Sequence, residues 1–213
     1  MRLYLPLLFV ALAVAGCSNP EKTGRYLIDP PDMGRVNNAL GTAELKDVSL
    51  PEYAAAGEVS WQTADGAVRS NPRSLWADKP ERAFTLTLAR TISDISGATV
   101  IAEPWPLAEP PKRRVEVRVE RALAQSNGIY RLTGRYYVSN DSSGGANYAR
   151  SFDIQVPLAA EGPGPIARAQ SQALGQLARQ IATLGGTGST VRTTAPKMDP
   201  LFGPLSLAPV EGS

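Results

Sequence analysis

The stretch RRVEVRVERALA, residues 113–124, decides the fold of this chain. Three valines alternate in it with three charged residues, a period of two that is typical of a strand with one buried and one solvated face. The valines are Val115, Val117 and Val119, and the charged residues are Glu116, Arg118 and Glu120. Such a charged stripe is most often a surface paired with the neighbouring strand; the alternative interpretation is an edge that binds a partner.

Two more strands are predicted after this one. Beyond the turn at 126–128 the chain continues as IYRLTGRYYVSN (129–140), turns again at 141–145, and continues as NYARSFDIQVPL (147–158). Strands of this kind joined by short polar connections that contain glycine are typical of hairpins. The region 113–158 is therefore predicted to form an antiparallel meander.

Two segments that flank this region are predicted to be helices. In 165–184 the apolar residues recur on one helical face, while glutamines and an arginine lie off it. The segment 80–95 is ambiguous, because Phe84, Leu86 and Leu88 alternate as in a strand, whereas Phe84, Leu88, Ile92 and Ile95 share a helical face. A helix is favoured here, since that pattern continues over more turns and Pro80 suits a first helical turn.

Shorter strands complete the predicted sheet. They are RYLID at 25–29, stopped by Pro30 and Pro31; a strand within 43–53, closed by Pro51; a hairpin of 58–62 and 67–69; and 99–102. Trp61 is interpreted as a packing residue of that hairpin. The predicted fold class is α/β, with a mixed, largely antiparallel sheet of about five or more strands packed with two main helices.

The single cysteine, Cys17, follows a pattern typical of export. Residues 5–16 are almost wholly apolar and follow Arg2, and small residues stand directly before the cysteine. As a helix, 5–16 would reach about 18 Å, short of the roughly 30 Å of a bilayer core, so a signal peptide is predicted at 1–16. The order Val14-Ala15-Gly16-Cys17 resembles a bacterial lipobox, which predicts that Cys17 carries a lipid. An ordinary signal peptide with an incidental cysteine is the alternative.

Composition limits the function classes. The chain has 22 basic and 20 acidic residues and no histidine. This balance argues against nucleic acid as a partner, and histidine-dependent metal sites and catalytic triads are excluded. No cofactor or metal is expected, and no catalytic residue is predicted. The remaining enzymatic hypothesis is an acid and base pair of Asp94 and Glu103, although neither stands in a motif.

The chain is predicted to divide into four parts. They are a signal peptide at 1–16, a lipidated leader at 17–24, one domain at 25–184, and a disordered tail at 185–213 rich in Gly, Pro, Ser and Thr. The leader is short, with a coil reach of roughly 15 Å, so the domain is expected to lie close to the membrane. Ser18 follows the cysteine, and this favours the outer membrane over the inner one.

Several of these motifs, taken in order, resemble the PqiC/YmbA-like auxiliary lipoproteins of ABC-type transport. They are the lipobox cysteine, YLIDPP, VSLPEY, SLWADKPERAF, the hairpin beginning VEVRVERALA and the helix IARAQSQALGQLARQIATL, within residues 14–184. The resemblance implies a non-enzymatic domain like the anticodon-binding and TolB N-terminal groups, anchored in the outer membrane through Cys17. It also implies an MCE-domain, periplasm-spanning protein as partner in intermembrane lipid transport. A homo-oligomeric ring is a further expectation. The alternative is a structural envelope-assembly lipoprotein that moves no lipid.

Overall fold

A computed structural model describes residues 22–140 and 145–192, and this part of the chain contains nine strands and three helices. The strands are β1 Gly24–Tyr26, β2 Thr42–Leu45, β3 Glu58–Gln62, β4 Val68–Trp76, β5 Thr99–Ala102, β6 Arg113–Ala124, β7 Ile129–Asn140, β8 Ala146–Pro157 and β9 Thr187–Arg192. The helices are α1 Glu52–Ala55, α2 Pro80–Ser96 and α3 Pro163–Ala182.

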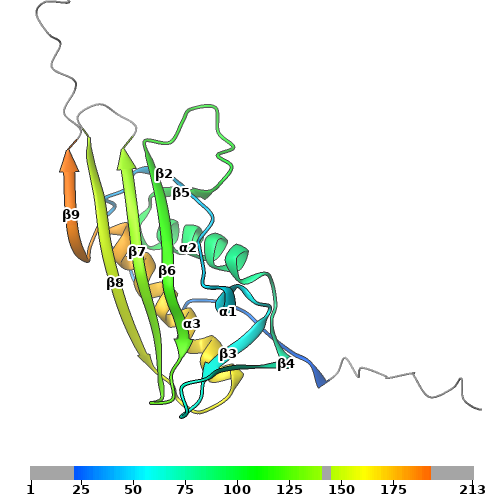
Figure 1. The fold of residues 1–213 in the computed structure, drawn as a ribbon. Coiled ribbons are helices and arrows are strands. Elements are labelled where there is room, and N and C mark those ends of the chain that lie inside the picture. The colour runs from blue at the N-terminus through cyan, green and yellow to red at the C-terminus, as the bar shows by residue number, and fades with distance from the viewer. Residues whose placement is uncertain (1–21, 141–144, 193–213) are drawn as a thin grey trace, which may run out of the picture.

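The sheet is built around the meander that the sequence predicts. Its order is β1-β4-β3-β6-β7-β8-β9, and β2 pairs in parallel with both β5 and β6 (Figure 1). β6 and β7 pair antiparallel from Arg113↔Asn140 to Ala124↔Tyr130, and a register shift separates Val119 from Arg121. The pairs β3–β4, β6–β7, β7–β8 and β8–β9 are antiparallel. The predicted mixed, largely antiparallel sheet is confirmed.

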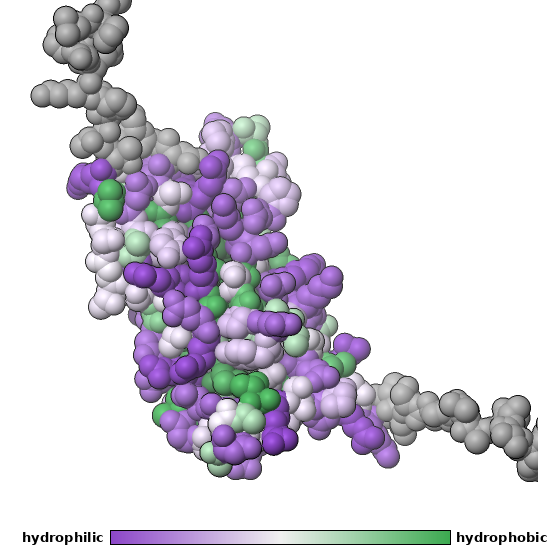
Figure 2. All heavy atoms as spheres, in the orientation of Figure 1, coloured by the Kyte–Doolittle hydropathy of each residue, from purple (hydrophilic) through white to green (hydrophobic). Residues whose placement is uncertain are grey.

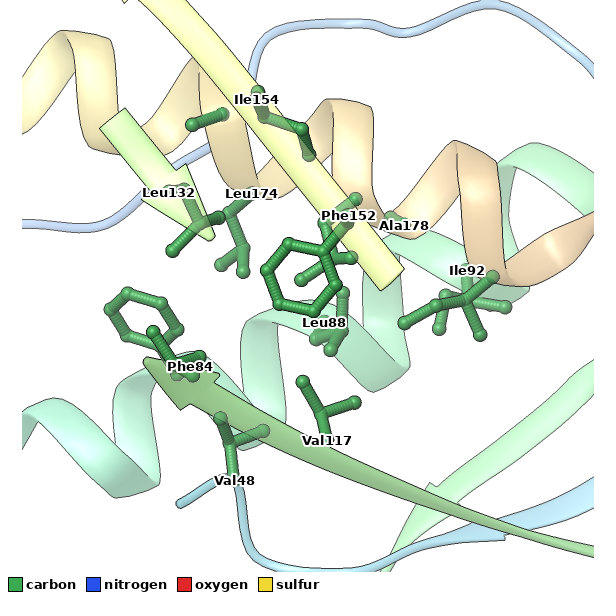
Figure 3. Close-up of a cluster of buried hydrophobic side chains, with 14 of the residues drawn as sticks. Val48, Phe84, Leu88, Ile92, Val117, Leu132, Phe152, Ile154, Leu174 and Ala178 are labelled. Carbon is green, nitrogen blue, oxygen red and sulfur yellow. The ribbon is translucent and has the colours of Figure 1, made fainter. Parts of the chain in front are cut away.

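Both long helices cover one face of this sheet (Figure 1). The helical interpretation of 80–95 is confirmed: Phe84, Leu88 and Ile92 are all buried, and Gly97 ends α2 in the left-handed region with φ 72°. Glycine suits that position because it has no Cβ to clash there. Side chains of α2 and α3 meet those of the three long strands in one apolar core (Figure 3).

The strand predicted at 25–29 is shorter in the structure. β1 covers only Gly24–Tyr26, so it begins inside the predicted leader. The chain then leaves the sheet, because the Asp29 N–H donates to Ser171 Oγ on α3 at 2.9 Å and Ile28 is buried in the helix-side core. The alternation in RYLID therefore continues past the point at which helix contacts replace strand pairing.

The tail prediction is wrong for residues 187–192. This polar segment forms β9, which pairs with β8 from Ser151↔Thr187 to Ala146↔Arg192. All residues of β9 are exposed, so burial of apolar side chains does not explain why this segment forms a strand. Backbone hydrogen bonds to the edge of β8 hold it instead, together with Arg150, whose guanidinium donates to Ser189 O and Thr190 Oγ1. The remainder of the predicted tail, 193–213, lies outside the described residues.

Candidate functional site

A groove of about 600 Å³ opens at one end of the sheet. Three segments that are distant in sequence form it: the β3–β4 hairpin, the end of β6 with its turn into β7, and the connection after β8 together with the first turn of α3. Figure 2 shows apolar side chains gathered at the same end of the molecule, where Figure 1 places the lower ends of β3 and β6. The lining residues are Trp61, Gln62, Thr63, Ala64, Asn71, Ser74, Ala124, Gln125, Ser126, Gly128, Leu158, Glu161, Gly162, Pro163 and Ile166.

The walls of the groove are mainly apolar. Trp61 is half-buried and packs against the core, and Ala124 and Ile166 are buried. Leu158 is held in place by a backbone hydrogen bond from its N–H to Gly128 O at 2.8 Å. The prediction that Trp61 is a packing residue is therefore confirmed, and the same side chain also lines this opening.

Polar groups at the rim are engaged in local turns. Thr63 Oγ1 donates to Ala67 O at 3.0 Å, and Gln62 Nε2 donates to Gly66 O at 3.3 Å. Asn71 Oδ1 accepts from the Arg73 N–H at 2.9 Å. These bonds satisfy polar atoms near the mouth, so the groove offers an apolar surface with a hydrated edge, an arrangement typical of ligand pockets.

The groove lies beside the first strand of the described chain. In the parallel β1–β4 ladder Gly24 pairs with Ser74, and Ser74 is one of the lining residues. Two residues further on, the Tyr26 ring reaches the start of α3: a Cβ built on Gly164 would lie 3.8 Å from Tyr26 Cε1. β1 therefore lies alongside the part of β4 that carries Ser74, a wall residue of the groove.

The uncovered face of the sheet carries the charged stripe of β6. Arg118 pairs with Glu116 on its own strand at 2.6 Å and lies over the Tyr137 ring at 5.2 Å. Its neighbour across the ladder is Arg135, a like charge. The structure therefore corrects the predicted cross-strand pairing: the ion pair of Arg118 runs along β6.

A second ion pair on this face joins neighbouring strands. Arg131 on β7 makes two hydrogen bonds to Asp153 on β8, at 2.9 and 2.6 Å. These bonds from Arg131 lower the pKa of Asp153, because they stabilise its charged form. A polar hollow of about 510 Å³ lies beside this pair, lined in part by Arg121 and Arg135.

The predicted site residues that the structure describes lie outside the groove. Cys17, the predicted attachment site, lies outside the described residues. Asp94 is exposed on α2. Glu103 is exposed after β5, and its carboxylate accepts a hydrogen bond from the Asp47 N–H at 2.8 Å. Neither carboxylate lines the groove.

The described residues contain neither a metal-binding cluster of side chains nor a helix suited to crossing a membrane. Residues 22–140 and 145–192 hold no group of three or more His, Cys, Asp or Glu side chains that could bind a metal ion. Within the same ranges, none of the helices combines the length and apolar character that crossing a membrane requires.

No pattern in the sequence predicts the groove. Its lining comes from segments near 61–74, 124–128 and 158–166, and each of these is short and lacks a motif. The available signal was the single Trp61 in an otherwise polar hairpin. Only the packing of β3 beside the end of β6, where Trp61 pairs with Ala124, brings these segments together.

Comparisons with known proteins give the family from one family model and a similar fold from two solved structures. Residues 26–182 match the family described as ABC-type transport auxiliary lipoprotein component. No curated protein sequence matches the chain. A crystal structure of an uncharacterized protein is 18% identical, with a TM-score of 0.59 over 71% of this chain and 97% of its own. A protein from Xanthomonas campestris, assigned to the family DUF330, is 14% identical, with a TM-score of 0.53 over 75% of this chain and 90% of its own. The chain therefore belongs to the family of ABC-type transport auxiliary lipoprotein components.

Proposed function

We propose that this protein is anchored by a lipid on Cys17 at the periplasmic face of the outer membrane and serves an intermembrane lipid-transport system. The family match over residues 26–182 is the observation that carries this proposal, because it covers nearly all of the described fold. The lipobox pattern ending at Cys17 supports the anchor. Two or three acyl chains on one cysteine make a durable anchor, whereas a single chain holds a protein only marginally.

The partner that we propose is an MCE-domain protein that spans the periplasm. The short chain between Cys17 and β1 supports this arrangement, because about 15 Å of coil would keep the domain near the membrane surface. There the domain would dock the outer end of the partner and so support envelope integrity. In this role Asp94 and Glu103 are surface carboxylates, and we propose no catalytic function for them.

We also propose that several copies form a ring around the partner. A ring needs a head-to-tail contact between two different surfaces of the same chain. The sheet offers two such edges, since β1 and β9 stand at opposite ends of the strand order. Strand edges expose backbone donors and acceptors, which makes them natural sites for pairing with another chain.

Membrane fractionation of wild type against Cys17→Ser tests the anchor, with Ser18→Ala as the matched control. We expect an acylated mass and outer-membrane fractionation for wild type and Ser18→Ala, and loss of both for Cys17→Ser. An unmodified mass for wild type would overturn the anchor.

Crosslinking in intact cells, followed by identification of captured proteins, tests the partner. Capture of an MCE-domain protein by wild type, reduced in Cys17→Ser, is the expected result. A normally anchored protein that captures no MCE-domain partner would overturn the transport role and favour the structural alternative.

A further inference from the structure

We infer that the groove beside β1 binds one acyl chain of a phospholipid from the membrane that carries the anchor. This inference rests on the proposed function, because the anchor is what brings the groove to the membrane. It goes further in assigning a lipid-binding site to the domain itself.

The lining of the groove indicates what kind of molecule it would bind. Trp61, Leu158 and Ile166 supply apolar surface, and Glu161 is the only charged side chain among the described residues of the lining. The Glu161 carboxylate would repel an anionic group that entered the groove, such as the carboxylate of a free fatty acid. The groove therefore suits an uncharged hydrocarbon chain whose headgroup stays outside in water.

The size and shape of the groove agree with this ligand. Its volume of about 600 Å³ lies within the roughly 300–1,000 Å³ that small-molecule pockets occupy. It is an opening between layers, since the β3–β4 hairpin forms one wall and the first turn of α3 forms another. An extended apolar chain can enter between such walls and bury its methylenes against both.

The position of the groove identifies the source of the lipid. Gly24 pairs with Ser74 in the groove wall, and the chain from there back to Cys17 would reach only roughly 15 Å as a coil. The groove is thereby held next to the bilayer in which Cys17 would be inserted. Phospholipid acyl chains are the apolar groups present at the highest concentration in a bilayer, which favours them as occupant over a second copy of the chain or an apolar segment of the partner.

Photo-crosslinking tests this inference. Full-length protein is extracted from whole cells with detergent, so that acylated and unacylated protein are both recovered, and is placed in mixed micelles that contain a phospholipid with a diazirine on one acyl chain. It is then irradiated and analysed by peptide mapping. Two variants fill the groove from its exposed rim, Ser126→Trp and Asn71→Trp. Ser139→Trp is the matched control, since Ser139 is an exposed residue of β7 that does not line the groove.

We expect lipid adducts on peptides that contain residues 61–64, 124–128 or 161–166 in wild type and Ser139→Trp, and their loss in both groove variants. Thermal unfolding of every variant shows that the fold is retained. Adducts spread over the whole surface, or adducts that both groove variants leave unchanged, would overturn the inference. So would a crosslink between two protein copies through the groove without a lipid adduct.

Failure of the inference and failure of the anchor are distinguishable in this design. Micelles bring lipid to the groove whether or not Cys17 is acylated, so adduct mapping reports on the groove alone. Flotation of the same protein with vesicles reports on the anchor alone. Flotation without groove adducts overturns the inference only, whereas groove adducts without flotation overturn the anchor and leave the groove site supported.

Discussion

The two faces of strands β6, β7 and β8 are made by alternate residues of the same chain, yet different forces shape them. On the helix-covered face, Val117, Leu132 and Ile154 are buried in the core (Figure 3). On the uncovered face, Arg118, Arg135 and Asp153 are exposed. The free energy gained by burying apolar area is additive and has no preferred direction. The covered face is therefore stable whenever apolar residues occupy alternate positions of each strand. The contribution of the uncovered face to stability depends on which charged residues the strand register places opposite each other.

The covered face therefore supplies the stability of the fold, whereas the uncovered face tolerates charged residues with little effect on stability. Arg118 and Arg135, two like charges, stand directly opposite each other across β6 and β7. Such a pair costs a few tenths of a kcal/mol at a solvated surface. Four substitutions test this contrast between the faces, and the expected loss of stability decreases from the first to the last.

Truncating the core should have the largest effect. Leu174 on α3 is fully buried in the core cluster. Leu174→Ala should lower the free energy of unfolding by about 3 kcal/mol, because methylene burial is lost and a cavity remains. Arg135→Ala on the uncovered face is the control and should change it by less than about 0.5 kcal/mol. Urea titration monitored by tryptophan fluorescence measures both, and equal effects would remove the contrast between the faces.

Adding one methyl group to the covered face should come next. A Cβ built on Gly134 would lie 2.2 Å from Arg118 O and 2.7 Å from Phe152 Cζ, so both the backbone of β6 and a core ring would have to shift. Gly134→Ala should cost about 2 kcal/mol through this overpacking. Its control is Thr133→Ala, next in the chain and on the other face, which should be close to neutral. A neutral Gly134→Ala in the same urea titration would contradict the close approach.

Removing one buried hydroxyl should cost less. Tyr136 Oη donates to Gln180 O at 3.3 Å and to Gly185 O, just before β9. Tyr136→Phe should lower the free energy of unfolding by about 1 kcal/mol, because one donor is lost and its carbonyl partners remain. Tyr137→Phe, on the uncovered face, should have a smaller effect. Hydrogen exchange of amides in 187–192 should rise in Tyr136→Phe only.

The same substitution predicts a pH dependence. Burial raises the pKa of Tyr136 well above its ordinary value of about 10, because the charged phenolate is disfavoured inside the fold. The folded state therefore holds this proton more tightly than the unfolded state does. The contribution of Tyr136 to the free energy of unfolding is fully present below a pH of about 10 and decreases as the pH rises above that value. Tyr136→Phe should make that fall shallower; a fall of unchanged slope would contradict this prediction.

The ion pair on the uncovered face should have the smallest effect. Arg131 lowers the pKa of Asp153, so the pair stabilises the fold above the ordinary aspartate pKa of about 4, and this contribution is lost as the pH falls through the lowered value. Both side chains are substantially exposed, so Asp153→Asn should cost less than about 1 kcal/mol at pH 7 and nothing in strong acid. Urea titrations at pH 7 and pH 2 measure the difference. Asp29→Asn is the control: its exposed pair with Arg90 has a single hydrogen bond, so this substitution should cost less than Asp153→Asn at pH 7.

Much of the fold could be predicted because its long elements repeat a clear period. β6, the two strands that follow it, α2 and α3 are each longer than ten residues, and each contains a local period of apolar residues. The shorter elements could not be predicted in the same way. α1 covers only Glu52–Ala55, and β4 extends to Trp76, beyond the 67–69 segment expected for the hairpin. Their extents depend on neighbours that are distant in the sequence.

The two candidate sites, Cys17 and the groove, also differ in whether a local sequence pattern predicts them. The Cys17 pattern is a linear signal that an export and lipidation system would recognise in an extended chain, so a sequence suffices to propose it. The groove is different, because no single segment contains it. Its hairpin wall and its β6 wall meet where Trp61 pairs with Ala124.

Local patterns in the amino-acid sequence are therefore sufficient to predict the meander, the two long helices, the family resemblance and the candidate attachment residue. Each of these depends on residues close together along the chain, where side-chain period and local chemistry are sufficient. The tertiary structure alone decided where β1 ends, that the polar segment 187–192 becomes a strand, and that three unremarkable segments enclose a groove. The physical reason is that backbone pairing and layer packing join residues of large sequence separation, and a polar strand gains its hydrogen bonds only when a finished edge is already present.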